Sequence, residues 1–243
     1  MNLITLLIVI SNLSLSGCDD SSPVTKHEAI YHSSSSVTST AAIAIPDNYG
    51  AEVAQNILAL GGNAVDAAVA TGFALAVTFI DAGNIGGGGF MTVKMDNDIA
   101  FLDYREKAPL KAHKDMYLDA QGNVIDNITL IGGQAAGVPG TVAGFWEAHK
   151  RFGKLPWNEV VKPAIHLATN GFIPAPILVD SIHSMEQRFE GKTNFNDHFN
   201  HINSSKVFKQ PELAKTLARI AEFGADDFYR GKTAALIVEE MKR

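Results

Sequence analysis

The sequence has very little cysteine and no concentration of positive charge. Cys18 is its only cysteine, so no disulfide can form within the chain. Its 20 Lys and Arg residues are scattered and face 26 Asp and Glu, which gives a formal net charge of −6. Nucleic acids bind through dense basic patches, so we expect no nucleic-acid partner. With 243 residues and 46% hydrophobic content, the chain can fill one large or two ordinary globular domains.

Several familiar catalytic motifs are also missing. No Gly-Lys-Ser/Thr follows the glycine run 86–89, which excludes a P-loop, and the spacing does not fit G-x-G-x-x-G. Close backbone packing, which glycine allows, is the better interpretation of this run. G-x-S-x-G is absent, so nothing favours a serine hydrolase. His198 and His201 lie three residues apart in a segment typical of a solvated loop, without a second ligand pair, so we predict no metal site and no cofactor.

The N-terminus is typical of a lipoprotein signal peptide. The apolar run 3–10 is too short to remain a membrane-spanning helix and suits a signal-peptide core, although no Lys or Arg precedes it. The run ends in Leu-Ser-Gly-Cys at 15–18, which resembles a bacterial lipobox with cleavage before Cys18. An ordinary signal peptide or a buried helix with an incidental cysteine is the alternative. We predict a signal peptide at 1–17 and a lipid anchor on Cys18 in the periplasm, at the inner membrane because Asp19 follows.

Residues 18–40 are polar and rich in serine, a composition that cannot bury a core, and we predict a flexible tether there. The folded region is expected at 41–243, with early strands followed by a long helical part, which indicates a layered α/β body. The patterns predict strands at 41–45, 89–95 and 99–105, and helices at 48–60, 64–79, 141–152, 157–170, 175–189, 211–223 and 231–243.

The segment 61–109 contains the most specific local signals. Asn63 follows two glycines and stands three residues before Asp66, which predicts a helix start with a capping box. The helix that follows is rich in Ala and Gly, so another backbone is expected to pass close to it. The glycine run 86–89 then leads into a strand, and a second strand delivers the sequence Asp-Tyr-Arg-Glu at 103–106.

Arg105 is the candidate binding residue. If the strand 99–105 is regular, Asp103 and Arg105 lie on one face, where the carboxylate could hold the guanidinium. A guanidinium binds a carboxylate through two parallel hydrogen bonds, which suits an α-carboxylate ligand. A structural ion pair with Asp103 or Glu106 is the competing interpretation, and spacing alone favours it.

These motifs resemble the large-subunit part of the γ-glutamyltranspeptidases, also called glutathione hydrolases. The quoted matches are GGNAVDAAVA, AGN-x-GGGGF and D-[FY]-R-E-x-A-P, followed by GVPGTVAG at 137–144, Lys-Pro-Ala at 162–164, ATNGF at 168–172 and FYRG at 228–231. The resemblance runs from about residue 41 to the end. It implies part of the four-layer αββα sandwich of N-terminal-nucleophile hydrolases, incomplete in this chain.

The resemblance also implies an activity. The family transfers the γ-glutamyl group of glutathione and related amides to water or an amino acid, without a cofactor. Its nucleophile is a threonine freed by autocatalytic cleavage at the start of the small subunit, which would lie beyond Arg243, so no catalytic residue is expected here. Arg105 would hold the substrate α-carboxylate. The alternatives are a non-catalytic lipoprotein module that binds γ-glutamyl compounds, and a cephalosporin-acylase-like amidase.

Overall fold

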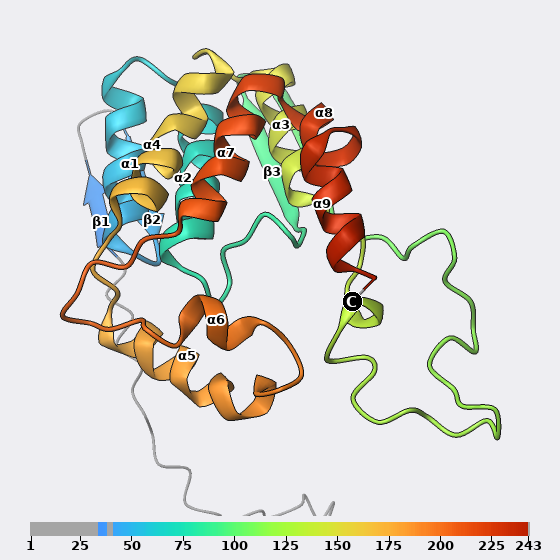
Figure 1. The fold of residues 1–243 in the computed structure, drawn as a ribbon. Coiled ribbons are helices and arrows are strands. Elements are labelled where there is room, and N and C mark those ends of the chain that lie inside the picture. Colours follow the sequence, from blue (N-terminus) through green and yellow to red (C-terminus); the bar gives the residue numbers. More distant parts are fainter. Residues whose placement is uncertain (1–33, 38–40, 243) are drawn as a thin grey trace, which may run out of the picture. The chain divides into compact units, whose positions relative to one another are not determined.

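A computed structural model describes residues 34–37 and 41–242 of the chain, all within one compact unit. The predicted signal peptide and Cys18 lie outside the described residues. The strands are β1 (Ser34–Val37), β2 (Ala42–Ile45), β3 (Phe90–Met95) and β4 (Asp98–Asp103), and a short 3-10 helix lies at Gly133–Ala135 (Figure 1). The helices are α1 (Asn48–Ala59), α2 (Ala64–Thr78), α3 (Thr141–Phe152), α4 (Trp157–Asn170), α5 (Pro176–Phe189), α6 (Phe195–Phe199), α7 (Pro211–Phe223), α8 (Ala225–Arg230) and α9 (Lys232–Glu240).

The described strands form two antiparallel pairs. β1 pairs with β2, with Ser34 opposite Ile45, and β3 pairs with β4, with Phe90 opposite Asp103. β1 falls inside the segment that its serine content marked as a tether. The neighbouring strand offers Ser34–Val37 backbone partners that composition does not reveal.

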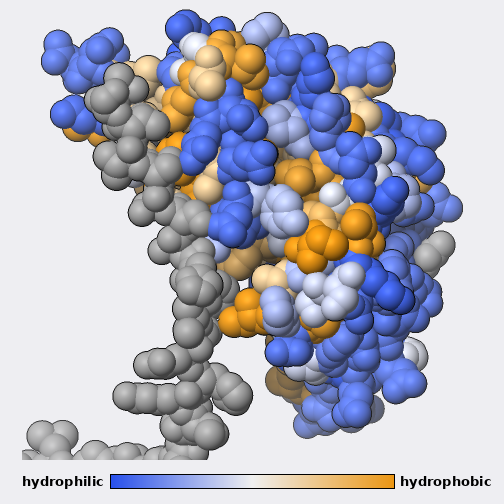
Figure 2. All heavy atoms as spheres, turned by 90° about the vertical axis from the view of Figure 1, so that its left-hand side faces the viewer, coloured by the Kyte–Doolittle hydropathy of each residue, from blue (hydrophilic) through white to orange (hydrophobic). Residues whose placement is uncertain are grey.

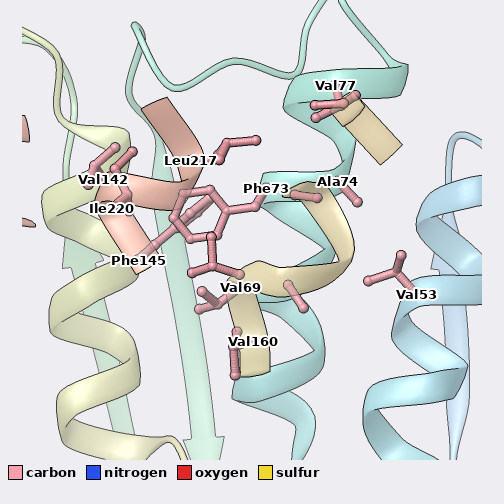
Figure 3. Close-up of a cluster of buried hydrophobic side chains, with 14 of the residues drawn as sticks. Val53, Val69, Phe73, Ala74, Val77, Val142, Phe145, Val160, Leu217 and Ile220 are labelled. Atoms are coloured by element: carbon pink, nitrogen blue, oxygen red, sulfur yellow. The ribbon is translucent and has the colours of Figure 1, made fainter. Parts of the chain in front are cut away.

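Helix α2 is the centre of the helical layer. It packs against both α1 and α4, and α4 in turn packs against α7 (Figure 1). The Phe73 ring of α2 is fully buried and meets Phe145 of α3 and Trp157 of α4 edge-on, with ring centroids 5.1 and 5.6 Å apart. Leu217 and Ile220 of α7 complete this cluster (Figure 3). Burial of an aromatic core side chain of this kind stabilises the fold by roughly 1.5–3 kcal/mol.

The small residues of α2 were expected to let another backbone pass close to the helix, and at Gly72 the close neighbour is a side chain instead. A Cβ on Gly72 would lie 2.3 Å from Cζ of Phe145, so the space above this glycine is filled by an aromatic ring and not by a passing backbone. The ring of Phe145 can then reach Phe73. Because Gly72 has no side chain, the Phe145 ring of α3 can pack directly on α2.

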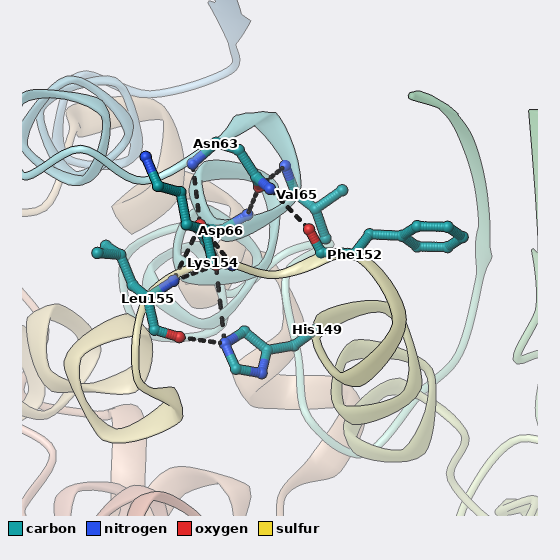
Figure 4. Close-up of polar contacts among 7 residues, drawn as sticks. All are labelled: Asn63, Val65, Asp66, His149, Phe152, Lys154 and Leu155. Carbon is teal, nitrogen blue, oxygen red and sulfur yellow. Dashed lines mark hydrogen bonds and ion pairs between the residues drawn. The ribbon is translucent and has the colours of Figure 1, made fainter. Parts of the chain in front are cut away.

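The capping box at the start of α2 is confirmed, and its acid extends beyond the helix. Asn63 Oδ1 accepts hydrogen bonds from the backbone amides of Val65 and Asp66, and Asp66 Oδ2 accepts one from the Asn63 amide at 2.9 Å. The fully buried Asp66 carboxylate also accepts from the backbone amides of Lys154 and Leu155 (Figure 4). One side chain thus joins the start of α2 to the connection between α3 and α4.

His149 and Asn63 strengthen the same junction. His149 Nε2 lies 2.8 Å from the Leu155 carbonyl oxygen and 3.7 Å from Asp66 Oδ1, while Asn63 Nδ2 donates to the Phe152 carbonyl oxygen at 2.6 Å (Figure 4). Phe152 closes α3, where helix carbonyls lack partners within the helix. The polar junction therefore fixes the C-terminal end of α3 against α2.

A second buried acid orders the C-terminal helices. Asp227 of α8 is buried, forms an ion pair at 3.3 Å with Arg219 Nε of α7, accepts a hydrogen bond from Thr233 Oγ1, and accepts another from the Lys232 amide at 3.1 Å. Lys232 begins α9, so Asp227 provides one of the acceptors that the first turn of a helix needs. This arrangement holds α7, α8 and α9 together.

Most predicted helices are confirmed, and the differences are local. Pro176 begins α5 one residue later than predicted, and α9 spans 232–240 of the predicted 231–243. The segment around 194–204 is not merely a solvated loop: α6 forms there, and Phe195 and Phe199 pack against the core. α8 was not predicted. Short helices of five or six residues are held by packing and leave little periodic signal.

The surface of the described part is mixed. Figure 2 shows one face on which apolar side chains lie in separate patches among hydrophilic ones. On the β3–β4 pair, Phe90 and Phe101 are exposed and stack at a centroid distance of 5.7 Å. Within 34–37 and 41–242, no helix has the length and apolar character needed to cross a membrane.

Candidate functional site

The end of the β3–β4 pair places Arg105 between two backbone anchors. Beyond the last paired residues, Tyr104 and Gly89 exchange two hydrogen bonds, with N···O distances of 3.0 and 3.3 Å. Two residues past Arg105, Lys107 and Val138 exchange another two, at 3.1 and 2.8 Å. The backbone of Arg105 is therefore held on both sides, although it lies outside a regular strand.

The glycine run packs closely beneath this segment, as the sequence predicts. A Cβ on Gly88 would lie 2.5 Å from the Tyr104 carbonyl oxygen, which no side chain allows. The Gly87 carbonyl oxygen accepts hydrogen bonds from the amides of Gly140 and Thr141, at 2.7 and 3.0 Å. The run thus connects the Arg105 segment to the start of α3.

Two further glycines bring α3 against Tyr104. A Cβ on Gly140 would lie 1.9 Å from the Tyr104 carbonyl oxygen, and a Cβ on Gly144 would lie 2.1 Å from Cγ of the Tyr104 ring. Burial raises the pKa of Tyr104, whose hydroxyl donates to the Phe90 carbonyl oxygen at 3.3 Å. The first turn of α3 is therefore a direct support for the residue that precedes Arg105.

The side chain of Arg105 is exposed, and its guanidinium is free to bind a ligand. Its Cζ lies 5.9 Å from the centroid of the Phe90 ring, within cation–π range. Across the described residues the guanidinium has no ion-pair partner, so neither Asp103 nor Glu106 neutralises it. This free charge matches a residue that receives an anionic ligand.

Asp103 supports Arg105 differently from the prediction. β4 ends at Asp103, so side chains no longer alternate between faces at Arg105. The Asp103 carboxylate instead accepts a hydrogen bond from the Arg105 backbone amide, with an N···Oδ1 distance of 3.1 Å. The expectation that it holds the guanidinium is wrong in this structure, because the strand ends two residues too early. Asp103 fixes the backbone of Arg105 and leaves the side chain free.

Arg105 opens onto a cavity of about 490 Å³ between β4 and one face of α3. Gly140, Gly144 and Glu147 line it from α3 and its start, together with Arg151 near the end of that helix. Basic lining residues are Arg105, Lys107 and Arg151, and acidic ones are Asp103 and Glu147. Such a mixture suits a zwitterionic ligand, because an α-amino acid presents both a carboxylate and an ammonium group. Nowhere in the described chain do three or more His, Cys, Asp or Glu residues form a possible metal site.

Tyr229 of α8 closes one wall of this cavity. Its hydroxyl donates to the Pro139 carbonyl oxygen at 2.9 Å and accepts from the Ala143 amide at 3.1 Å. Burial raises the pKa of Tyr229, and the hydrogen bond from the Ala143 amide opposes this shift. No sequence pattern indicates a role for Tyr229, because its partner Ala143 lies 86 residues away in the chain. Gly140, the residue before α3, has no side chain that could cap the helix, and this indicates that the first-turn amides need an acceptor from another part of the chain.

The wall is formed by the segment 138–140 and the Tyr229 ring, and a second cavity of about 490 Å³ lies on its other side. It is lined mainly by apolar residues, including Phe228 of α8 and Ile237 and Val238 of α9. Val138, Pro139 and Tyr229 line both cavities. The wall between them is therefore thin.

Comparison with known proteins gives a consistent result. The family model described as gamma-glutamyltranspeptidase matches residues 50–243. A glutathione hydrolase proenzyme of Pseudomonas aeruginosa is 59% identical over 202 residues, and one of Escherichia coli is 43% identical over 207; each alignment covers 83% of this chain and 36% of the relative. The solved structure of γ-glutamyltranspeptidase from Pseudomonas nitroreducens, in complex with L-DON, matches with a TM-score of 0.80 and 58% identity, over 82% of this chain and 60% of that one.

The structural match confirms the predicted fold class. The described residues form a mixed α/β arrangement that corresponds to part of an N-terminal-nucleophile hydrolase. The chain spans about a third of the length of the curated relatives it matches.

Proposed function

This chain belongs to the γ-glutamyltranspeptidase family, and on that premise we propose that it is the large-subunit part of a glutathione hydrolase precursor. The complete protein cleaves the γ-glutamyl amide of glutathione and passes the glutamyl group to water or an amino acid. The observation that carries this proposal is the free guanidinium of Arg105, held at its backbone on both sides and open to a cavity with groups of both charges.

In the proposed mechanism Arg105 binds and orients the substrate. Its guanidinium holds the α-carboxylate of the γ-glutamyl group through two parallel hydrogen bonds. The hydroxyl of an N-terminal threonine, beyond Arg243, attacks the γ-carbonyl carbon while its own α-amine takes the proton. The amide nitrogen leaves with a proton as the free amine, and a glutamyl ester remains. Water or an amino acid then attacks the ester and releases the threonine.

The proposal is tested by Arg105→Lys in the complete precursor. Lysine keeps the positive charge but loses the two-pronged geometry, so we expect a higher KM for γ-glutamyl donors. Arg105→Ala should cost more, on the order of 2–5 kcal/mol, if the site is desolvated and the substrate carboxylate is left unpaired. The loss should fall mainly on KM, because the α-carboxylate is remote from the amide and is held alike in ground and transition states. Arg188→Lys, an exposed change on α5, is the control.

The outcomes separate binding from a purely structural role. A structural role predicts a lower melting temperature or failed self-processing, with near-normal kinetics in the protein that matures. An unchanged KM for Arg105→Lys would remove Arg105 from the substrate site. A donor amide that lacks the α-carboxylate adds a second test, since its KM should not respond to Arg105→Lys. Equal efficiency with both donors would favour the amidase alternative.

We also propose that the protein is a periplasmic lipoprotein, anchored through Cys18 to the inner membrane. Support comes from the Leu-Ser-Gly-Cys sequence at 15–18 and from Asp19 after it. Several acyl chains give stable anchoring where one chain would be marginal. Mass spectrometry of the membrane fraction should find Cys18 as a lipidated N-terminus, and Cys18→Ala should release the protein. An unmodified Cys18 would exclude the anchor.

A further inference from the structure

We infer that Tyr229 is a positioning residue for the substrate site: its hydroxyl fixes the wall that supports Arg105. The inference rests on the proposed role of Arg105 in binding the α-carboxylate. Tyr229 does not reach the guanidinium through any hydrogen bond, and it acts through the segment 138–140 and the first turn of α3.

The first turn of α3 needs a capping group that its own sequence does not provide. The residue before the helix is Gly140, and no side chain caps the helix from there. The Ala143 amide belongs to the third helical residue, whose N–H has no partner within the helix. Tyr229 accepts this hydrogen bond at 3.1 Å, so a hydroxyl from α8 replaces the missing cap.

The same hydroxyl connects the helix to the wall. It donates its proton to the Pro139 carbonyl oxygen at 2.9 Å, one residue before Gly140. Both capacities of the hydroxyl are thereby used, one as donor and one as acceptor. Phenylalanine at this position would keep the ring and its edge-on contact with Phe228 at 5.1 Å, and would lose both bonds.

Side-chain packing is sparse on two faces of this wall, which is formed by the segment 138–140 and the Tyr229 ring. Val138, Pro139 and Tyr229 line a cavity on each side, so neither side offers a dense layer of side chains. Side chains that face open space lose the contacts that fix a well-packed core. The hydrogen bonds of the Tyr229 hydroxyl to Pro139 and Ala143 therefore add a restraint that packing on these two faces does not supply.

The position of the wall determines the position of Arg105. Val138 exchanges two backbone hydrogen bonds with Lys107, and Gly140 packs directly on the Tyr104 carbonyl oxygen. These contacts lie on the two sides of Arg105 in the sequence. A shift of the segment 138–140 therefore moves the backbone of Arg105 relative to a bound carboxylate, and two-pronged binding tolerates such shifts poorly.

The experiment is Tyr229→Phe in the complete precursor, compared with Tyr49→Phe. Tyr49 is the matched control because its hydroxyl also makes two hydrogen bonds to backbone, both to Ile173, and does not line the Arg105 cavity. We expect Tyr229→Phe to raise KM for a γ-glutamyl donor by about three- to tenfold, with kcat within about twofold of the wild type. Tyr49→Phe should leave KM unchanged. Hydrogen exchange of the Ala143 amide should accelerate only in Tyr229→Phe.

The combined variant separates this inference from the proposed function. If Arg105→Lys and Tyr229→Phe act through one site, the double variant should raise KM by less than the product of the two single effects. A raised KM in Arg105→Lys with a normal KM in Tyr229→Phe would overturn the role of Tyr229 and keep that of Arg105. A normal KM in Arg105→Lys would reject the proposed binding role of Arg105, on which the role of Tyr229 depends. A lower melting temperature with normal KM in Tyr229→Phe would make the hydroxyl purely structural.

Discussion

Gly140 lies directly on the Tyr104 carbonyl oxygen, so closely that a Cβ there would be 1.9 Å from that oxygen. The two residues belong to segments 36 positions apart, and this contact joins the start of α3 to the Arg105 segment. The same glycine donates its amide proton to the Gly87 carbonyl oxygen at 2.7 Å. Three backbone segments thus meet at one residue, and only a residue without a side chain can occupy the position.

Gly140→Ala should therefore displace the Arg105 segment. We expect a loss of stability of about 1–3 kcal/mol, because the methyl group meets backbone that cannot move aside, and a raised KM in whatever protein matures. Gly86→Ala is the control: nothing lies within 4 Å of a Cβ there, although Gly86 belongs to the same glycine run. Melting temperature and donor KM of the two variants should differ clearly. Equal behaviour would contradict the close packing.

Asp66→Asn tests the polar junction between α2 and α3. The carboxylate accepts hydrogen bonds from the backbone amides of Asn63, Lys154 and Leu155. An asparagine side chain has only one oxygen, and its NH₂ group would face one of these amide donors. Leaving a buried amide without an acceptor should cost about 2–3 kcal/mol of stability. Asp96→Asn, an exposed change at a positive φ that Asn tolerates, should be neutral. Urea denaturation of both variants measures the difference, and a neutral Asp66→Asn would show that the junction adds little.

The helical layer could be predicted because its signals are local. Asn63 and Asp66 are three residues apart, and this spacing alone indicates the capping box that the structure contains. The contacts of Asp66 with Lys154 and Leu155 could not be predicted, because they join residues 88 and 89 positions apart. A sequence pattern shows which residue caps its own helix, but not which distant backbone the same carboxylate reaches.

The candidate site was predictable only in part. Arg105 was identified as a binding residue from its motif and its charge, and the structure leaves its guanidinium unpaired and open to a cavity. The expected strand geometry was wrong, because β4 ends at Asp103 and Lys107 then pairs with Val138. Tyr229 gave no local signal, since its hydrogen-bond partners are set by how α8 packs against α3.

The 243-residue polypeptide by itself should have no γ-glutamyl hydrolase activity. In the proposed mechanism this chain supplies binding and orientation, while the attacking threonine lies beyond Arg243, so no glutamyl ester can form. A chromogenic γ-glutamyl anilide measures turnover, with the mature complete protein as the positive control. Robust turnover by the polypeptide would mean that it contains its own nucleophile and would overturn the proposed division of roles.

The Tyr229 hydroxyl should make the stability of the complete protein depend on alkaline pH. Burial raises its pKa above the ordinary 10.0, although the Ala143 amide opposes the shift. A raised pKa means that the folded state holds its proton more tightly than the unfolded chain. This stabilising contribution is therefore fully present below about pH 10, and is lost as pH rises through the folded-state pKa.

Tyr104, whose pKa burial also raises, is present in both the wild type and Tyr229→Phe, so its effect largely cancels in the comparison. The melting-temperature advantage of the wild type over Tyr229→Phe should stay constant from about pH 7 to 9 and shrink above pH 10. An advantage that grows with alkaline pH would show that the hydroxyl is more acidic in the fold than in the unfolded chain, and that it does not serve as the proton donor to Pro139.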